Sequence, residues 1–134
     1  MSIYHCSIKN ISRSSGRSAV ACAAYRSGEE LEDVETGITH DYRKKTGIAF
    51  AEIFLCKNAP ERFQNREELW NEVEKIEKAA DARLAREIEV AIPRELSLEE
   101  MKNLVAGYAK MLTEEGMCVD AAIHLKVGNP HAHL

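Results

Sequence analysis

The sequence contains no long hydrophobic run. No stretch of its 134 residues approaches the roughly 18 consecutive apolar residues that a membrane-spanning helix needs. The opening segment, MSIYHCSIKN, also lacks the apolar core of a secretory signal peptide. These two absences predict a cytoplasmic protein without a membrane segment.

Cysteine is sparse and follows no recognisable spacing. The four cysteines (Cys6, Cys22, Cys56 and Cys118) match neither a zinc knuckle nor a CxxC redox pair. In a reducing compartment we expect them to be small buried hydrophobic residues, with a disulfide pair as the less favoured alternative. Internal repeats and low-complexity tracts are absent as well. With 45% hydrophobic and 30% charged residues, the composition predicts one folded domain over residues 1–134 and not a disordered chain.

An excess of positive charge is missing overall but present locally. The 18 basic and 22 acidic residues give a net charge of −4, which disfavours a non-specific binder of polyanions. Residues 1–28 nevertheless contain four basic residues and no acidic one: Lys9, Arg13, Arg17 and Arg26. The charge alone leaves two interpretations open, an ordinary solvated surface or a face that meets an anion such as phosphate.

Hydrophobic periodicity and capping residues predict an α+β domain. Ser18, Asn65 and Ser97 are each expected to cap the start of a helix, and Ser97 with Glu100 forms the clearest capping box. Residues 128–130 (Gly-Asn-Pro) predict a turn. The expected strands cover 2–9, 48–56, 83–92, 119–127 and 131–134, the expected helices cover 19–31, 65–79 and 97–115, and 32–47 is a loop or short hairpin. This order predicts a largely antiparallel sheet with helices packed on one face.

Each predicted strand has an apolar side and a polar side, because side chains alternate between the two faces of a strand. In the strand 119–127, His124 lies opposite the apolar set. In the strand 83–92, Glu87 and Glu89 lie opposite it. The polar side of the first strand holds His5, Ser7 and Lys9, and its apolar side holds Tyr4, Cys6 and Ile8. The polar sides therefore gather histidines and carboxylates.

Three histidines near the end of the sequence form a candidate metal site. His131 and His133 are two residues apart, so on a strand they point the same way, about 6.5–7 Å apart at the backbone. His124 lies just before the predicted turn, and a tight hairpin would bring it beside them. Three neutral imidazoles would hold a cation and leave coordination positions open, as in a catalytic site. Three ordinary surface histidines are the alternative, and the spacing does not decide between them.

Tyr25 lies in the predicted Ala-rich helix, AVACAAYRSGE, among small neighbours that would let a bulky group approach its ring. A phenol needs a nearby cation to act as a nucleophile. For a single tyrosine, however, a core or half-buried aromatic is the usual interpretation. The residues alone do not assign it a role.

Three segments resemble the MobA/MobL family of mobilisation relaxases, tyrosine nickases of the HUH superfamily. Residues 1–29 are similar to the family's start: a short strand with IYH, a Ser/Gly/Arg loop and an Ala-rich helix with a tyrosine. Residues 85–93 (AREIEVAIP) and 129–134 (NPHAHL) are similar to two further family segments, the second being its histidine–hydrophobic–histidine signature. The order is also that of relaxases, because rolling-circle replication initiators place the histidine pair before the tyrosine. The resemblance covers essentially the whole chain.

The resemblance implies site- and strand-specific DNA nicking and rejoining at a plasmid transfer origin. Tyr25 would attack a scissile phosphate, giving a 5′-phosphotyrosyl adduct and a free 3′-hydroxyl. His124, His131 and His133 would be the metal ligands, and Glu87 would orient one of them. Mg²⁺ or Mn²⁺ is the implied cofactor, although three histidines would bind Zn²⁺, Ni²⁺ or Co²⁺ more tightly in vitro.

The implied partner is single-stranded DNA at the origin, together with accessory mobilisation and coupling proteins. The DNA backbone would be held by Lys9, Arg13, Arg17 and Arg26. His5 would contact phosphate or assist proton transfer. Relaxase domains of this family continue past the histidine signature, so we expect residues 1–134 to be the N-terminal portion of such a domain, truncated at its C-terminus. Whether this portion nicks DNA by itself is left open.

Two other classes of function are kept. One is a metal enzyme acting on a small molecule, since HxH also occurs in cupin-type oxygenases. A cupin needs an all-β pattern, and the capped helices 65–79 and 97–115 argue against it. The other is a non-catalytic DNA-binding or assembly module. A covalent DNA adduct that depends on Tyr25 would separate a relaxase from such a module.

Overall fold

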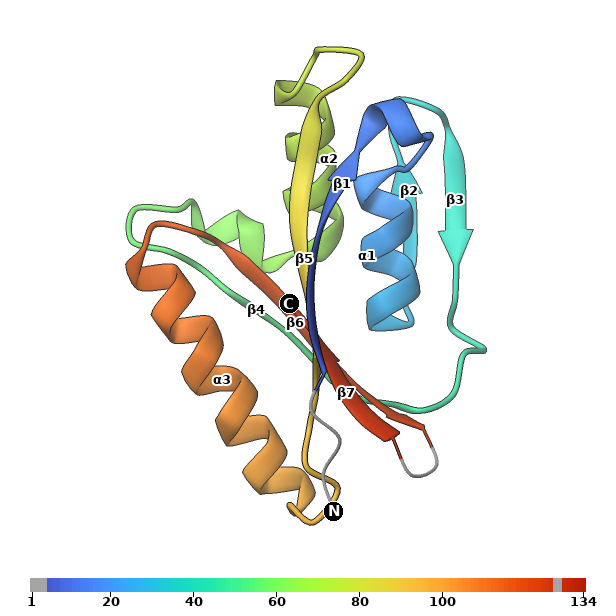
Figure 1. Cartoon of the computed structure of the whole chain (residues 1–134). Coiled ribbons are helices and arrows are strands. Elements are labelled where there is room, and N and C mark those ends of the chain that lie inside the picture. Colours follow the sequence, from blue (N-terminus) through green and yellow to red (C-terminus); the bar gives the residue numbers. More distant parts are fainter. Residues whose placement is uncertain (1–4, 127–128) are drawn as a thin grey trace.

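The computed structural model describes residues 5–126 and 129–134, which form three α-helices, a five-stranded sheet and a separate hairpin (Figure 1). The strands are β1 (Cys6–Ser12), β2 (Glu30–Asp33), β3 (Ile38–Asp41), β4 (Ile48–Phe54), β5 (Arg83–Ala91), β6 (Val119–Lys126) and β7 (Asn129–His133). The α-helices are α1 (Ala19–Ser27), α2 (Arg66–Ile76) and α3 (Leu98–Glu114), with 3₁₀ turns at Arg13–Ser15 and Glu61–Gln64. None of the described helices combines the length and the apolar character needed to cross a bilayer.

The large sheet has the strand order β1-β5-β7-β6-β4, and every neighbouring pair is antiparallel. The α+β class and the antiparallel sheet are therefore confirmed. The segment predicted as a loop or short hairpin contains the hairpin β2–β3. The end of the chain occupies a central position, because β7 lies between β5 and β6.

The helices lie on both faces of this sheet, which corrects the prediction of one covered face. Ile123 of β6 packs with Met101 and Val105 of α3. The next residue, His124, contacts the backbone of Arg26 in α1. Because consecutive side chains of a strand point to opposite faces, α3 and α1 lie on opposite sides of the sheet, as Figure 1 shows. Which face a helix covers is decided by long-range packing, which periodicity does not report.

Separate apolar clusters hold the helices. The cluster under α3 consists of Ile92, Met101, Val105, Ala109, Val119, Ala121, Ile123 and Ala132. On the other side, Val20, Ala23 and Ala24 of α1 pack with Leu31. The small alanines let α1 approach its neighbours closely, which brings its polar residues near the sheet.

Local signals placed the helix starts correctly. Ser18 and Asn65 accept hydrogen bonds from the N–H groups of Ala21 and Glu68. Both halves of the predicted Ser97–Glu100 capping box are present. These side chains satisfy N–H groups that have no partner within the helix.

The first helix is shorter than predicted. It ends at Ser27, because Gly28 adopts φ +72° and its N–H bonds to the Ala24 oxygen. A side chain at this position would be strained, and its Cβ would lie 2.6 Å from Cδ1 of Ile48. The chain then turns into β2 instead of continuing to residue 31.

The first strand also differs from its prediction. It runs to Ser12 instead of ending at Lys9, and residues 2–4 lie outside the described part. Its expected apolar side does not reach a core: Ile8 is 66% exposed and Cys6 is exposed, whereas Ile11 is buried. The reason is that β1 is an edge strand and that α3 contacts β4 and β6 instead.

Two smaller predictions need correction. None of the four cysteines is fully buried, and the Cys56 and Cys118 sulfur atoms lie 3.3 Å apart as thiols. Asn129 and Pro130 belong to β7, where they pair with Lys126 and Leu125. Two of the three residues of the predicted turn are therefore strand residues, and the third, Gly128, lies outside the described residues.

Candidate metal centre and nucleophile

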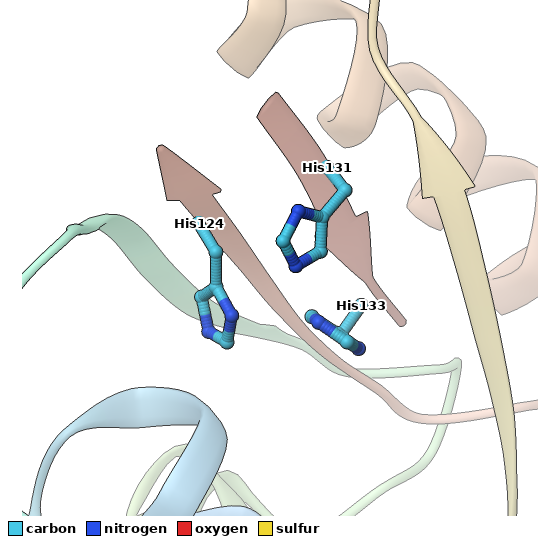
Figure 2. A group of neighbouring side chains, drawn as sticks. All are labelled: His124, His131 and His133. Atoms are coloured by element: carbon cyan, nitrogen blue, oxygen red, sulfur yellow. The ribbon is translucent and has the colours of Figure 1, made fainter. Parts of the chain in front are cut away.

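The register of β6 and β7 brings the three histidines together. His124 and His131 are direct cross-strand partners, and His133 follows two residues later on the same face. The ring centroids are 5.4 Å apart for His124–His131, 4.6 Å for His124–His133 and 4.9 Å for His131–His133. One nitrogen from each ring lies within 4.8 Å of the other two, and all three side chains are buried (Figure 2).

Each histidine uses one ring nitrogen to contact a protein oxygen. His124 Nε2 lies 2.9 Å from the Arg26 carbonyl oxygen, and His131 Nδ1 lies 3.1 Å from the Asn129 carbonyl oxygen. His133 Nδ1 lies 3.2 Å from Oε1 of Glu87. These oxygens are acceptors, so each contacted nitrogen carries the proton and donates. In a neutral ring the second nitrogen keeps its lone pair, which is the state a metal ligand needs.

The protonation of His124 agrees with this arrangement. Burial lowers the pKa of His124 to about 4, against the opposing effect of its hydrogen bond to Arg26. Repulsion from His133, Lys45 and His131 lowers it further. The ring is therefore neutral at pH 7.

Glu87 connects the histidines to α1. Its carboxylate accepts from His133 and forms a salt bridge with Arg26, and Arg17 lies 3.8 Å away. Burial alone raises the pKa of Glu87, but the hydrogen bonds from His133 and Arg26 outweigh burial and lower it to about 2. Glu87 is thus an anion held between a histidine and an arginine. Sequence reasoning expected it to orient a ligand histidine, and the structure places it in that contact.

The donor set fits a divalent metal ion. Three converging imidazole nitrogens are typical of sites that keep further coordination positions open. Glu87, Glu89 and His133 form a second group of ligand-type atoms within 4.8 Å. Because Glu87 already neutralises Arg26, the three-histidine group is the better candidate.

Tyr25 is the exposed residue of α1 next to this cluster. Tyr25 is 45% exposed, so it is not a core aromatic, and of the two ordinary interpretations only the half-buried one fits it. It directly precedes Arg26, whose carbonyl contacts His124 and whose guanidinium contacts Glu87. One helix therefore carries the tyrosine and two links to the histidine cluster.

The predicted DNA-contacting residues separate into groups. Lys9 and His5 are exposed on or just before β1. Arg17 and Arg26 are drawn toward Glu87. Arg13 is not brought to the histidines: it donates to the carboxylate and carbonyl of Glu74 and to the Ala79 carbonyl. Its contacts are those of a residue that fastens β1 to the end of α2.

Sequence reasoning missed two residues around Tyr25. The ring of Tyr42 packs edge-on against that of Tyr25, and Lys45 Nζ lies 3.4 Å from the Tyr25 ring centroid. Both come from a segment predicted only as loop or hairpin. No local signal in 32–47 indicates which helix that segment contacts.

The fold and the histidine cluster define an α+β protein with a candidate divalent-metal centre. Comparison with known proteins identifies the family to which it belongs. Residues 17–134 match the model of the MobA/MobL family, and the chain belongs to this family. It is 46% identical to the mobilization protein MobL of Acidithiobacillus ferridurans, over 92% of this chain and 32% of that protein. It is 39% identical to the conjugal transfer protein TraA of Rhizobium radiobacter, over 100% of this chain and 13% of that protein.

The fold has a close solved counterpart. A structure described as "Molecular Basis of Vancomycin Resistance Transfer in Staphylococcus aureus" matches with a TM-score of 0.93 and 36% identity, over 98% of this chain and 68% of that one. The chain spans about a third of MobL and about an eighth of TraA, as the coverage of 32% and 13% shows. The activities of the whole proteins are therefore taken up below as proposals.

Proposed function

We propose that this chain is the part of a mobilisation relaxase that nicks and rejoins one DNA strand at a transfer origin. The observation that carries the proposal is the position of α1. Its exposed Tyr25 directly precedes Arg26, and the Arg26 carbonyl contacts one of three buried, converging histidines. Helix α1 thus carries the proposed nucleophile and, through Arg26, contacts the candidate metal centre on β6 and β7. The relatives named for mobilisation and conjugal transfer support this proposal.

The proposed reaction exchanges one phosphodiester for another. The Tyr25 oxygen attacks the scissile phosphorus, a bond forms between that oxygen and the 5′-phosphate, and the P–O3′ bond breaks. The phenol gives up its proton, and the departing 3′-oxygen takes one up. No water or nucleoside triphosphate is consumed, because the tyrosyl phosphodiester retains the energy of the original bond. Attack by the 3′-hydroxyl on the adduct reverses the step.

The residues around the site have distinct roles in this proposal. His124, His131 and His133 would hold a divalent ion, which when bound would polarise a phosphate oxygen and offset the charge that builds up there. Glu87 fixes the orientation of His133 and keeps Nδ1 as the protonated nitrogen. Mg²⁺ or Mn²⁺ is the proposed physiological ion, although an all-nitrogen donor set binds later transition ions more tightly.

The DNA strand is proposed to cross the exposed side of β1 and the start of α1. Lys9, Arg17 and His5 are the predicted basic residues with side chains available to phosphates there. Arg26 is engaged by Glu87 and Arg13 by Glu74. We assign these two arginines to the architecture of the site first and to DNA second.

A covalent-adduct assay tests the proposal. The protein, expressed from its full reading frame in the source element, is incubated with Mn²⁺ and single-stranded oligonucleotides tiling the transfer region. We expect an SDS-stable protein–DNA band that disappears with Tyr25→Phe and with a chelator. Tyr108→Phe, which changes a 37% exposed tyrosine of α3, is the matched control and keeps the band. DNA binding without an adduct by folded, metal-loaded protein would favour a non-catalytic DNA-binding module and overturn the nickase.

A further inference from the structure

Lys45 contacts Tyr25 in two places. Its Nζ donates to the Tyr25 carbonyl oxygen at 2.9 Å and lies 3.4 Å from the centroid of the Tyr25 ring. Tyr42, from the same segment, meets that ring edge-on with centroids 5.3 Å apart and an interplanar angle of 86°. Two residues between β3 and β4 therefore contact the ring of the proposed nucleophile.

The backbone fixes this segment against the end of α1. The Tyr42 N–H donates to the Glu29 carbonyl at 3.1 Å, and the Lys45 N–H donates to the Tyr42 carbonyl at 3.0 Å. Figure 1 shows the chain after β3 passing the C-terminal end of α1 on its way to β4. Lys45 is thus held in place by its own turn, unlike a surface lysine that ranges freely in solvent.

A helix cap explains only one of the two contacts. The Tyr25 carbonyl belongs to the last turn of α1, where carbonyls lack partners within the helix. The N–H groups of Gly28 and Glu29 both bond to the Ala24 oxygen, so Lys45 supplies a donor that Tyr25 needs. The position of the ammonium on the face of the ring is a separate feature, and it is that of a cation–π contact.

The surroundings of Lys45 are positive. Burial lowers the pKa of Lys45, and repulsion by Arg26 and Lys126 adds to this effect. Such a concentration of positive charge is stabilised when an anion, such as a DNA phosphate, lies among these groups.

Building on the proposed function, we propose that Lys45 is a positioning residue for Tyr25, whose ammonium holds the phenol ring in place beside the histidine cluster. The positive charge on the ring face is the part that strand transfer needs, and the hydrogen bond to the helix end is not sufficient. The proposal therefore separates two properties of one side chain, its charge and its hydrogen-bond donor.

Three substitutions separate these properties. Lys45→Arg keeps the charge and the donor, Lys45→Gln keeps a donor without charge, and Lys45→Met keeps neither. Lys44→Gln is the matched control, because it removes the same charge from the neighbouring exposed position. The measurements are the single-turnover rate of adduct formation with saturating oligonucleotide, the dissociation constant of that oligonucleotide, and the ¹⁹F resonance of 3-fluorotyrosine at position 25, assigned with Tyr25→Phe.

We expect Lys45→Gln to slow adduct formation by about tenfold and to shift the Tyr25 resonance, with less than a threefold change in DNA affinity. Lys45→Arg should retain most of the wild-type rate of adduct formation, and Lys44→Gln should leave that rate unchanged. Equal rates for wild type and Lys45→Gln would reduce Lys45 to a helix cap and overturn the proposal. A loss confined to DNA affinity would make it a phosphate contact and would also overturn it.

The proposed function fails separately from this inference. If the wild-type protein forms no adduct, the nickase is overturned, and the inference that builds on it falls with it. If the wild type forms the adduct but Lys45→Gln changes neither the rate nor the fluorine resonance, only the role of Lys45 is overturned.

Discussion

The two faces of the central sheet are built from alternate residues of the same strands, yet one face is apolar and the other is polar. Toward α3, β6 and β7 present Ala121, Ile123 and Ala132, each 0–1% exposed. Toward α1, the same strands present His124 and His131 with their polar contacts. A shift of register by one residue would exchange the two sets. The same alternation therefore fixes both the core and the candidate site.

The polar face is tolerated because most of its buried charged groups have partners, although the buried Nε of Arg26 has no hydrogen-bond acceptor. Glu87 is paired with His133 and Arg26, and Asp120 accepts from Arg66 and Trp70 of α2. Burying such groups without partners would cost several kcal/mol. The comparison teaches that the α3 face contributes mainly to stability, whereas the α1 face holds the residues that the proposed chemistry requires. Substitutions on the two faces should therefore affect different measurements.

The largest expected effect concerns the α1 face. His133→Ala should weaken Mn²⁺ or Co²⁺ binding by more than the 10- to 100-fold typical of a lost outer-shell partner, because it removes a proposed ligand. Isothermal titration calorimetry of the metal measures the change. His5→Ala, an exposed histidine outside the cluster, is the control and should leave the affinity unchanged. Equal affinities for His133→Ala and wild type would contradict the three-histidine centre.

The second prediction concerns the α3 face. Ile123→Ala should lower the free energy of unfolding by about 2–5 kcal/mol, because it opens a cavity in the main cluster. Ile8→Ala makes the same chemical change at a 66% exposed position and should cost well under 1 kcal/mol. Urea denaturation of the metal-free protein compares the two. If Ile123→Ala instead left stability intact and reduced metal affinity, the division between the faces would be wrong.

The fold was predictable where its signals are local. The start of α3 follows from Ser97 and Glu100, and its buried Met101 and Val105 follow from helical spacing. The common face of His131 and His133 follows from strand alternation, and the short connection to β6 puts His124 opposite them. That these histidines bind a metal stays a prediction, since proximity of ligand atoms is not binding.

The features that the sequence did not predict depend on contacts between segments that are distant in the chain. The charge of Arg26 and Arg13 was visible in the sequence, but a sequence does not show whether an arginine meets a phosphate or a carboxylate. In the structure, Arg26 forms a salt bridge with Glu87 and Arg13 forms one with Glu74. Lys45 carried no signal at all, because its contact with Tyr25 arises from how the hairpin β2–β3 leads the chain past α1.

A third prediction tests the link between α1 and the cluster. Glu87→Gln should reduce metal affinity by about 10- to 100-fold, because His133 loses an anionic acceptor and Arg26 loses its counter-ion. Glu89→Gln is the matched variant on the same face of β5, and competition with a metallochromic chelator measures both. A larger loss for Glu89→Gln would indicate that Glu87, Glu89 and His133 hold the ion instead.

The smallest expected effect returns to the α3 face. Ser97→Ala should cost about 1 kcal/mol of unfolding free energy, because the Glu100 N–H loses its capping acceptor. The cost should depend on pH. Hydrogen bonds from the Ser97 backbone and side chain lower the pKa of Glu100 below its ordinary value of 4.5. A carboxyl with a lowered pKa contributes stability above its unfolded pKa and loses it as the pH falls through the folded value.

The difference between wild type and Ser97→Ala should therefore be constant near neutrality and shrink in acid below about pH 4. Urea titrations of both proteins from pH 3 to pH 7 measure this difference. Metal affinity at pH 7 should be equal in the two proteins, because Ser97 caps a helix on the opposite side of the sheet from the histidines. A pH-independent cost would mean that the Ser97 hydroxyl does not contribute to the lowered pKa of Glu100. Weaker metal binding would mean that the two faces are coupled through the strands they share.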